Sequence, residues 1–124
     1  GMSRNNSGLK KAKKLIRDLR VEYCENVLVG GSEYDFNQSL ERAWRVADFL
    51  EFGELMVTDA LERQESCGGH FNEKYQTDEN EALRDDKLFC HVSAWEYRGN
   101  SRKPKLHKEP LKFENVELTQ RSYK

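Results

Sequence analysis

The central segment of the chain, residues 35–65, has the apolar spacing of one long helix, and its apolar side chains occupy two adjoining faces. The first face carries Leu40, Ala43, Trp44, Ala47 and Leu50. The second carries Val46, Phe49, Leu50, Gly53, Met56, Val57, Ala60 and Leu61. Together they are wider than the apolar stripe of about 100° that is typical of a surface helix. Because one neighbouring helix can bury only one face, the sequence predicts a further element that covers the other.

The predicted ends of this helix carry their own signals. Asp35 is the predicted N-cap, and Gln38 three residues later would complete a capping box. Gly68 and Gly69 predict an abrupt stop, because glycine permits the positive φ of a sharp reversal. Gly53, in mid-helix, costs about 1 kcal/mol relative to alanine, so it predicts a bend or a close contact with another helix.

A second helix is predicted over residues 7–28. Ser7 is its predicted N-cap, and Gly30 and Gly31 are expected to end it. Its apolar side chains form one stripe of Leu9, Ala12, Leu15, Ile16, Leu19 and Tyr23. Lysines crowd its first turns, where the helix dipole disfavours positive charge. They indicate a solvated face or, alternatively, an anionic neighbour across an interface.

The C-terminal half has a different character. Residues 66–87 are polar and acidic and predict a surface loop, without the spacing of a calcium-binding loop. Residues 88–98 alternate between two faces and predict a strand, and residues 111–118 predict a second, shorter one that pairs with it antiparallel across an open loop. The predicted fold is therefore mainly α: an antiparallel helix pair with a small two-stranded antiparallel sheet and a long C-terminal tail, in a single domain over residues 1–124.

The composition and net charge of the chain argue against several classes of function. Charged residues make up 35% of the chain and hydrophobic residues 36%, which indicates either a thin core or a piece whose apolar faces meet another body. A net charge of −1 gives no field that would steer the chain onto nucleic acid or a membrane. No apolar run approaches the roughly 18 residues of a spanning helix, and no signal-peptide pattern opens the chain. The three cysteines are widely spaced and odd in number, which favours free thiols in a reducing compartment.

Cys67 and His70, at the corner that ends the long helix, are the first candidates for chemistry. A structural zinc site needs four ligands, and Cys90 and His91 could add two only if the strand folded back onto the corner. Catalysis by a Cys–His pair needs a third residue that orients the imidazole and an oxyanion hole, and the spacing indicates neither. The sequence favours a sharp reversal with Cys67 and His70 packed at its edge, and the alternative is a corner that docks on another domain.

The sequence gives even less support for a nucleotide-binding or nucleic-acid-binding site. No strand leads through a Gly-x-Gly-x-x-Gly turn into a helix, so nothing is expected to cradle a dinucleotide. The basic stretch from Arg98 to Lys108 is balanced by Glu109, Glu114 and Glu117, so nucleic-acid binding is not favoured. No catalytic, cofactor-binding or metal residue is predicted in this chain. The residues alone indicate a mostly helical domain with a small sheet that docks on another body.

Several motifs, in order along the chain, resemble a known family. Residues 37–51 are similar to the long helix in the C-terminal domain of the flavoprotein subunit of fumarate reductase and succinate dehydrogenase, and residues 63–70, RQESCGGH, resemble that family's R-x-E-S-R-G-[AG]-H signature. The opening residues 1–5 and 8–10 look like the stretch before the preceding helix. Residues 95–97, 106–111 and 113–114 match its strand pair, and residues 121–123 look like its terminal R-x-Y. The likeness is strongest to the branch with a diheme membrane anchor.

This resemblance implies an incomplete three-helix bundle, because the first helix of the family's bundle lies upstream of residue 1. It also implies that the chain is the C-terminal piece of a larger flavoprotein that interconverts fumarate and succinate by hydride transfer at FAD. The flavin and the substrate-binding residues of the family lie on other domains, so no cofactor is expected in this chain. The implied partners are the N-terminal flavin domain, an iron–sulfur subunit and, indirectly, a membrane anchor. The implied location is the cytoplasmic face of a bacterial inner membrane.

Five residues of the corner are candidates for docking on another domain: Arg63, Glu65, Ser66, Cys67 and His70. The family usually has arginine where this chain has Cys67, so no role of that guanidinium carries over. L-aspartate oxidase has a similar corner and is an alternative identity for the parent enzyme. A free-standing helical interaction module is the alternative from a different class. The second apolar face of the long helix also predicts that the isolated chain self-associates.

Overall fold

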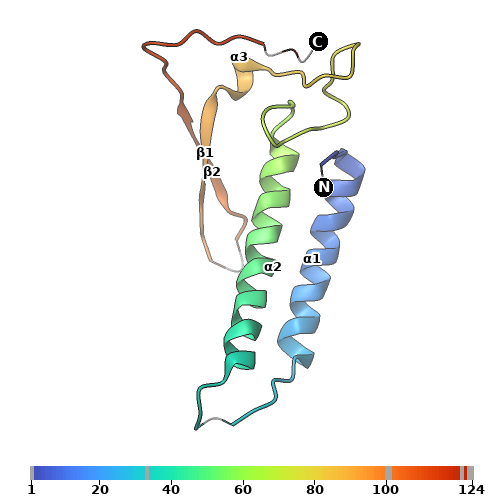
Figure 1. The fold of residues 1–124 in the computed structure, drawn as a ribbon, viewed down its shortest axis with the longest axis vertical. Coiled ribbons are helices and arrows are strands. Elements are labelled where there is room, and N and C mark those ends of the chain that lie inside the picture. The colour runs from blue at the N-terminus through green and yellow to red at the C-terminus, as the bar shows by residue number, and fades with distance from the viewer. Residues whose placement is uncertain (1, 33, 100–101, 121, 123–124) are drawn as a thin grey trace. The chain divides into compact units, whose positions relative to one another are not determined.

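The computed structural model describes residues 2–32, 34–99, 102–120 and 122. Its elements follow the order α1, α2, α3, β1, β2 (Figure 1). Two compact units contain them, and each is described separately. Residues 5–62 form the helical unit, and the ribbon unit consists of the segment before residue 5 together with residues 63–124. The prediction of a single domain stays a prediction. Gly1 and the R-x-Y residues Arg121 and Tyr123 lie outside the described residues.

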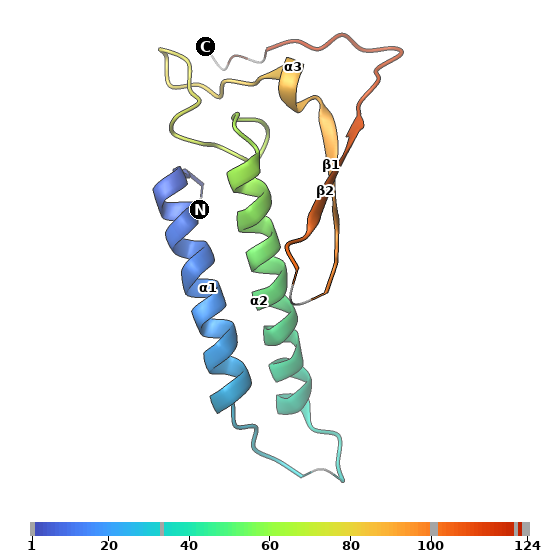
Figure 2. The ribbon, with the colours of Figure 1, turned by 180° about the vertical axis from the view of Figure 1, so that it is seen from behind.

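The helical unit is an antiparallel pair, which confirms the predicted fold class. Helix α1 spans Asn6–Asn26 and helix α2 spans Gln38–Glu62, and they lie side by side in both views (Figures 1 and 2). The predicted cap at Ser7 is wrong, because the side chain of Asn5 accepts a hydrogen bond from the Gly8 backbone at 2.8 Å. Helix α1 also ends at Asn26, before the glycine pair that was expected to stop it.

The start of α2 differs from the prediction in the same way. Asn37, rather than Asp35, caps the helix: its Oδ1 accepts hydrogen bonds from the backbone N–H groups of Ser39 at 3.0 Å and Leu40 at 3.1 Å. The amide nitrogen of Asn37 donates to the carbonyl of Gly30 at 3.0 Å. One side chain therefore both caps α2 and fixes the connection from α1.

The two helices meet at Gly53 and at one ion cluster. A Cβ built on Gly53 would lie 3.8 Å from Cδ1 of Ile16, so the predicted close contact with another helix is confirmed. Glu54 of α2 accepts hydrogen bonds from Arg17 at 2.6 Å and from Arg20 at 2.8 Å. Burial raises the pKa of the Glu54 carboxyl, but the hydrogen bonds and charges of the two arginines outweigh it and lower the pKa overall.

Much of the apolar surface of the helical unit stays exposed. Large side chains of α2 are more than half exposed: Trp44 (65%), Phe49 (66%), Phe52 (59%) and Met56 (52%). This confirms that α1 covers only part of the apolar circumference of α2. Phe52 belongs to neither predicted face and was missed. No helix among the described residues combines the length and the apolar character needed to cross a bilayer.

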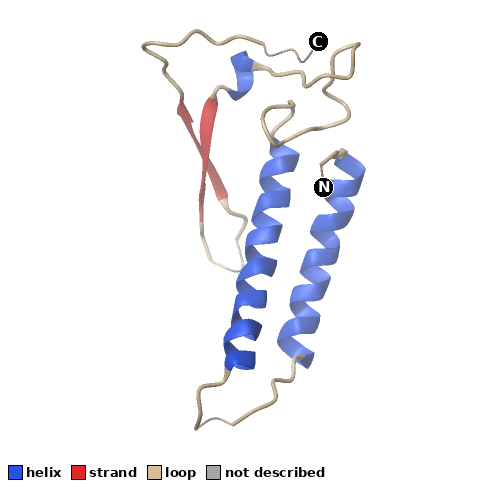
Figure 3. Ribbon diagram, viewed as in Figure 1, coloured by secondary structure: helices blue, strands red, loops and turns tan. Residues whose placement is uncertain are grey.

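The ribbon unit contains the short helix α3 (Asp86–Phe89) and two antiparallel strands, β1 (His91–Glu96) and β2 (Lys105–Pro110). His91 pairs with Pro110 and Glu96 with Lys105. The first strand is confirmed over a shorter range, because its expected first residues form α3. The second strand is wrong at 111–118: residues 111–120 form neither helix nor strand (Figure 3). Strand β2 is almost wholly exposed, so its sequence shows no alternation.

Candidate functional site

A two-residue turn forms the corner that the sequence singled out. The backbone N–H of Cys67 donates to the carbonyl of His70 at 2.9 Å, and the N–H of His70 donates back to Cys67 at 3.0 Å. Gly68 has φ of +56°, where a side chain is strained. Gly69 needs no such φ, and a Cβ there would have no neighbour within 4 Å. The predicted sharp reversal is confirmed, and its tip consists of two exposed glycines.

Beneath this tip lies a buried polar pair. Ser66 is fully buried and Asn72 is 1% exposed. The Ser66 hydroxyl accepts a hydrogen bond from the Asn72 backbone N–H at 2.8 Å and donates to the Asn72 carbonyl at 3.1 Å. The Ser66 backbone N–H donates to the carbonyl of Leu83 at 2.8 Å. These three hydrogen bonds join Ser66 to Asn72 and to Leu83, so Ser66 connects the corner to the loop that follows it.

A buried ion pair sits beside it. Glu65 is 2% exposed, and its Oε1 accepts from Arg63 at 2.8 Å while its Oε2 accepts from the Asp85 backbone at 2.9 Å. The other end of the Arg63 guanidinium donates to the carbonyl of His91 at 3.1 Å. A buried carboxylate is tolerated only when it is paired and hydrogen-bonded in this way. The pair ties the corner to the start of β1.

Both ring nitrogens of His70 make hydrogen bonds within the chain. Arg4 donates from Nη1 to Nδ1 of His70 at 2.9 Å, and arginine can only donate, so Nδ1 is an acceptor. Nε2 therefore carries the proton and donates to the carbonyl of Arg63 at 2.9 Å. With neither nitrogen free, His70 cannot serve as the base of a Cys67 nucleophile in this arrangement. Among the described residues, no group of three or more His, Cys, Asp or Glu side chains could hold a metal ion.

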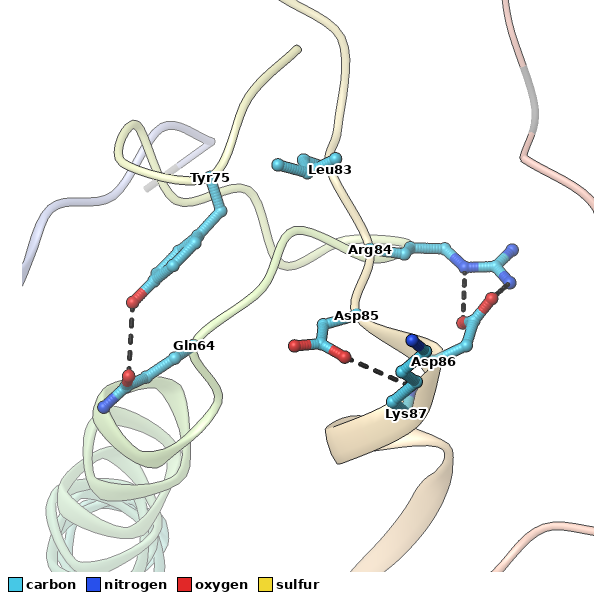
Figure 4. A pocket seen from close by; sticks show the side chains of 7 residues that line it. All are labelled: Gln64, Tyr75, Leu83, Arg84, Asp85, Asp86 and Lys87. Atoms are coloured by element: carbon cyan, nitrogen blue, oxygen red, sulfur yellow. Dashed lines mark hydrogen bonds and ion pairs between the residues drawn. The ribbon is translucent and has the colours of Figure 1, made fainter.

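A shallow groove of about 400 Å³ runs along the same unit (Figure 4). Most of its polar side chains are already engaged: Tyr75 donates to Gln64 at 3.3 Å, Asp85 caps α3, and Asp86 forms an ion pair with Arg84 at 2.5 Å. The hydrogen bond to Asp86 raises the pKa of Arg84. The remaining lining residues are Leu83 and Lys87. Sequence reasoning missed this groove, because residues 71–87 carry no periodic pattern.

The described residues contain no dinucleotide-binding unit of the kind in which a strand leads through a glycine-rich turn into a helix. The sheet is a two-stranded antiparallel ribbon, and neither strand leads through a glycine-rich turn into a helix.

The structure brings the five predicted docking residues into one corner. Glu65 and Ser66 are buried there by the chain itself. Arg63, Cys67 and His70 are partly exposed, and Arg63 and His70 take part in the internal bonds. Sequence reasoning missed Arg4, which completes the network. The docking role of these residues stays a prediction.

Comparisons with known proteins agree with this fold. The chain is similar to a chain of a quinol–fumarate reductase solved with menaquinol molecules, with a TM-score of 0.75 and 22% sequence identity over 94% of this chain. The match covers 19% of that protein, so this chain spans about a fifth of its length. A search of curated proteins finds no match. Residues 1–123 match the family model for the C-terminal region of the fumarate reductase flavoprotein, and the chain belongs to that family.

Proposed function

We propose that this chain is the structural C-terminal domain of a fumarate reductase or succinate dehydrogenase flavoprotein subunit, and that it docks on the flavin domain through its corner. The family supports this assignment, and so does the span of about a fifth of the matched reductase chain. The parent reaction would be the interconversion of fumarate and succinate at FAD, which the rest of the subunit would bind. An iron–sulfur subunit would carry the electrons, at the cytoplasmic face of a bacterial membrane.

The shape of the corner is the observation that supports docking. Its side chains hold each other through a buried network, so the turn is fixed without help from another chain. Its tip presents only Gly68 and Gly69, which leave the backbone uncovered. Exposed glycines at a rigid tip allow another body to approach the backbone closely.

The exposed seam of α2 supports a missing neighbour in the helical unit. Val46, Phe49 and Met56 are spaced by three and seven residues and therefore share one face, beside the contact of Gly53 with α1. Val46, Phe49 and Met56 are 43–66% exposed. We assign this seam to the upstream helix that the family's three-helix bundle implies.

A single glycine substitution tests the docking. Gly69→Leu should leave the domain folded, because a side chain there meets open space. In the full-length subunit it should lower FAD retention and fumarate reduction, because the leucine would hold the flavin domain away. Gly30→Leu is the matched control, since a Cβ at Gly30 also meets nothing within 4 Å.

The outcomes separate the alternatives. Normal flavin content and turnover in the Gly69→Leu subunit would show that the corner does not dock there. A full-length protein that oxidises L-aspartate instead of interconverting fumarate and succinate would be the sister enzyme. A natural protein of this length without flavin or any larger partner would be a free-standing module.

A further inference from the structure

The segment after β2, residues 111–118, forms neither helix nor strand, bends at residues 114–115 and carries exposed apolar side chains. We call this segment the strap. Four of its side chains are 43–69% exposed: Leu111, Phe113, Val116 and Leu118. The polar residues Lys112, Glu114 and Glu117 lie between them. Leu111 and Phe113 form one apolar pair and Val116 and Leu118 form a second, on either side of a bend at residues 114–115. Exposed apolar pairs of this kind usually mark a segment that contacts another surface.

Both ends of the strap are held by the ribbon unit. At the first end, the Leu111 N–H donates to the carbonyl of Cys90 at 3.1 Å. Beyond the second end, Arg84 donates to the carbonyl of Thr119 at 3.0 Å, and the side chain of Gln120 donates to the carbonyl of Ala82 at 2.6 Å.

Arg84 is itself fixed by two hydrogen bonds to Asp86, at 3.0 Å and 2.5 Å. Both ends of the strap are therefore fixed before any partner binds, and this reduces the entropy lost on docking.

The backbone of the strap is available for pairing. Over residues 112–118, no N–H or C=O group makes a hydrogen bond within the described part of the chain. An extended segment with open backbone groups can add to the edge of a sheet, and its apolar side chains then fill pockets on the partner. Strand β2, which precedes the strap, offers no comparable row of apolar side chains.

We propose that the strap docks, in extended form, on the part of the flavoprotein subunit that precedes this chain in the polypeptide. This inference rests on the proposed function. The matched reductase chain is about five times as long as the region that this chain covers. In a parent subunit of that length, the remaining polypeptide would offer a large surface for the strap. A short strap offers less than the roughly 1,000 Å² that separate chains need for a stable interface. Covalent linkage removes that requirement by raising the effective concentration.

Hydrogen–deuterium exchange on the full-length subunit, purified without its partner subunits, tests the proposal. The amides of residues 112–118 should exchange about 100-fold more slowly than in an unstructured peptide of the same sequence. Phe113→Ser combined with Val116→Ser should abolish this protection. Lys112→Ser, a polar change within the strap, should preserve it. The two apolar residues are exposed in this domain, so their loss leaves its own fold intact.

Three results would overturn the proposal. Unprotected strap amides in the full-length subunit would show that the strap stays on the surface. Protection that appears only after the iron–sulfur subunit is added would assign the strap to that subunit. Protection that rises with protein concentration would assign it to a second copy. Flavin content and fumarate reduction of the same preparation test the proposed function separately, because neither readout depends on exchange at the strap.

Discussion

Arg4 and His70 lie 66 positions apart in the chain, and the Arg4 guanidinium donates a 2.9 Å hydrogen bond to the imidazole Nδ1 of His70. Two backbone bonds run beside it, from the Arg4 N–H to the carbonyl of Phe71 at 3.0 Å and from the Glu73 N–H to the carbonyl of Arg4 at 2.8 Å. The segment before α1 is thereby attached to the corner at residues 67–70.

A double-mutant cycle on this pair measures the attachment. We expect Arg4→Ala and His70→Ala to show a coupling of about 1 kcal/mol in urea unfolding, because the hydrogen bond is partly buried and one partner is charged. The control cycle is Lys14→Ala with Asp18→Ala, whose side chains are 80% and 58% exposed. That pair should couple by less than about 0.5 kcal/mol. Equal coupling in the two cycles would contradict the assigned role of Arg4.

The sequence could not predict Arg4 as a member of this site. Spacing identifies partners that lie within a few turns of each other, and the two residues meet only through the fold. The corner itself was predictable, because Gly68 and Gly69 lie shortly after the end of a long apolar pattern, and glycine permits the positive φ that a sharp reversal needs. The burial of Glu65 and Ser66 could not be predicted, because it depends on Asp85, Leu83 and Asn72 in the loop that follows.

The two long helices were predictable for a similar reason, and their caps were not. A spacing of three and four residues over many turns tolerates local errors. Each helix start, however, offers several side chains that can cap. Asn5 is used instead of Ser7, and Asn37 instead of Asp35. The strands show the opposite: the apolar residues at 111–118, which predicted a strand, lie in a segment that forms none, while the paired strand β2 is charged and exposed. The family resemblance placed residues 106–111 in the strand pair, where periodicity did not.

Acidification should weaken the helical unit through Glu54. Its pKa is lowered, since the two arginines outweigh the effect of burial, so its contribution is present above the unfolded-state pKa of about 4.3. That contribution is lost as the pH falls through the lower pKa of the folded state. We expect Glu54→Gln to cost at most about 1 kcal/mol at pH 7, because Arg17 is 59% exposed. The cost should shrink as the pH falls below the unfolded-state pKa of about 4.3.

Urea titrations at several pH values measure this effect. Glu51→Gln, an exposed carboxylate on the same helix, is the control and should change stability little at any pH. A Glu54→Gln deficit that stays constant from pH 7 to pH 3 would contradict the assignment.

Alanine at Gly53 should stabilise the helical unit. The added methyl group would meet only Cδ1 of Ile16, at an ordinary contact distance of 3.8 Å. Alanine is also favoured over glycine in a helix by up to about 1 kcal/mol. Thermal unfolding should therefore show a higher midpoint for Gly53→Ala. Gly68→Ala is the opposite case, because its φ of +56° strains a side chain. It should lower the midpoint, and a rise for both variants would show that backbone conformation does not distinguish them.

The isolated 124-residue chain should self-associate through the exposed face of α2. Phe49 and Phe52 are 66% and 59% exposed on one helix, and contiguous apolar surface of this kind is usually covered by a partner. Without an upstream helix, a second copy is the nearest apolar surface available. Sedimentation equilibrium should give an average mass above that of the monomer, and Phe49→Ser with Phe52→Ser should return it to the monomer value. Leu28→Ser removes an even more exposed apolar side chain (95%) outside α2 and should leave the association unchanged. A strict monomer at high concentration would mean that this face is stable in water on its own.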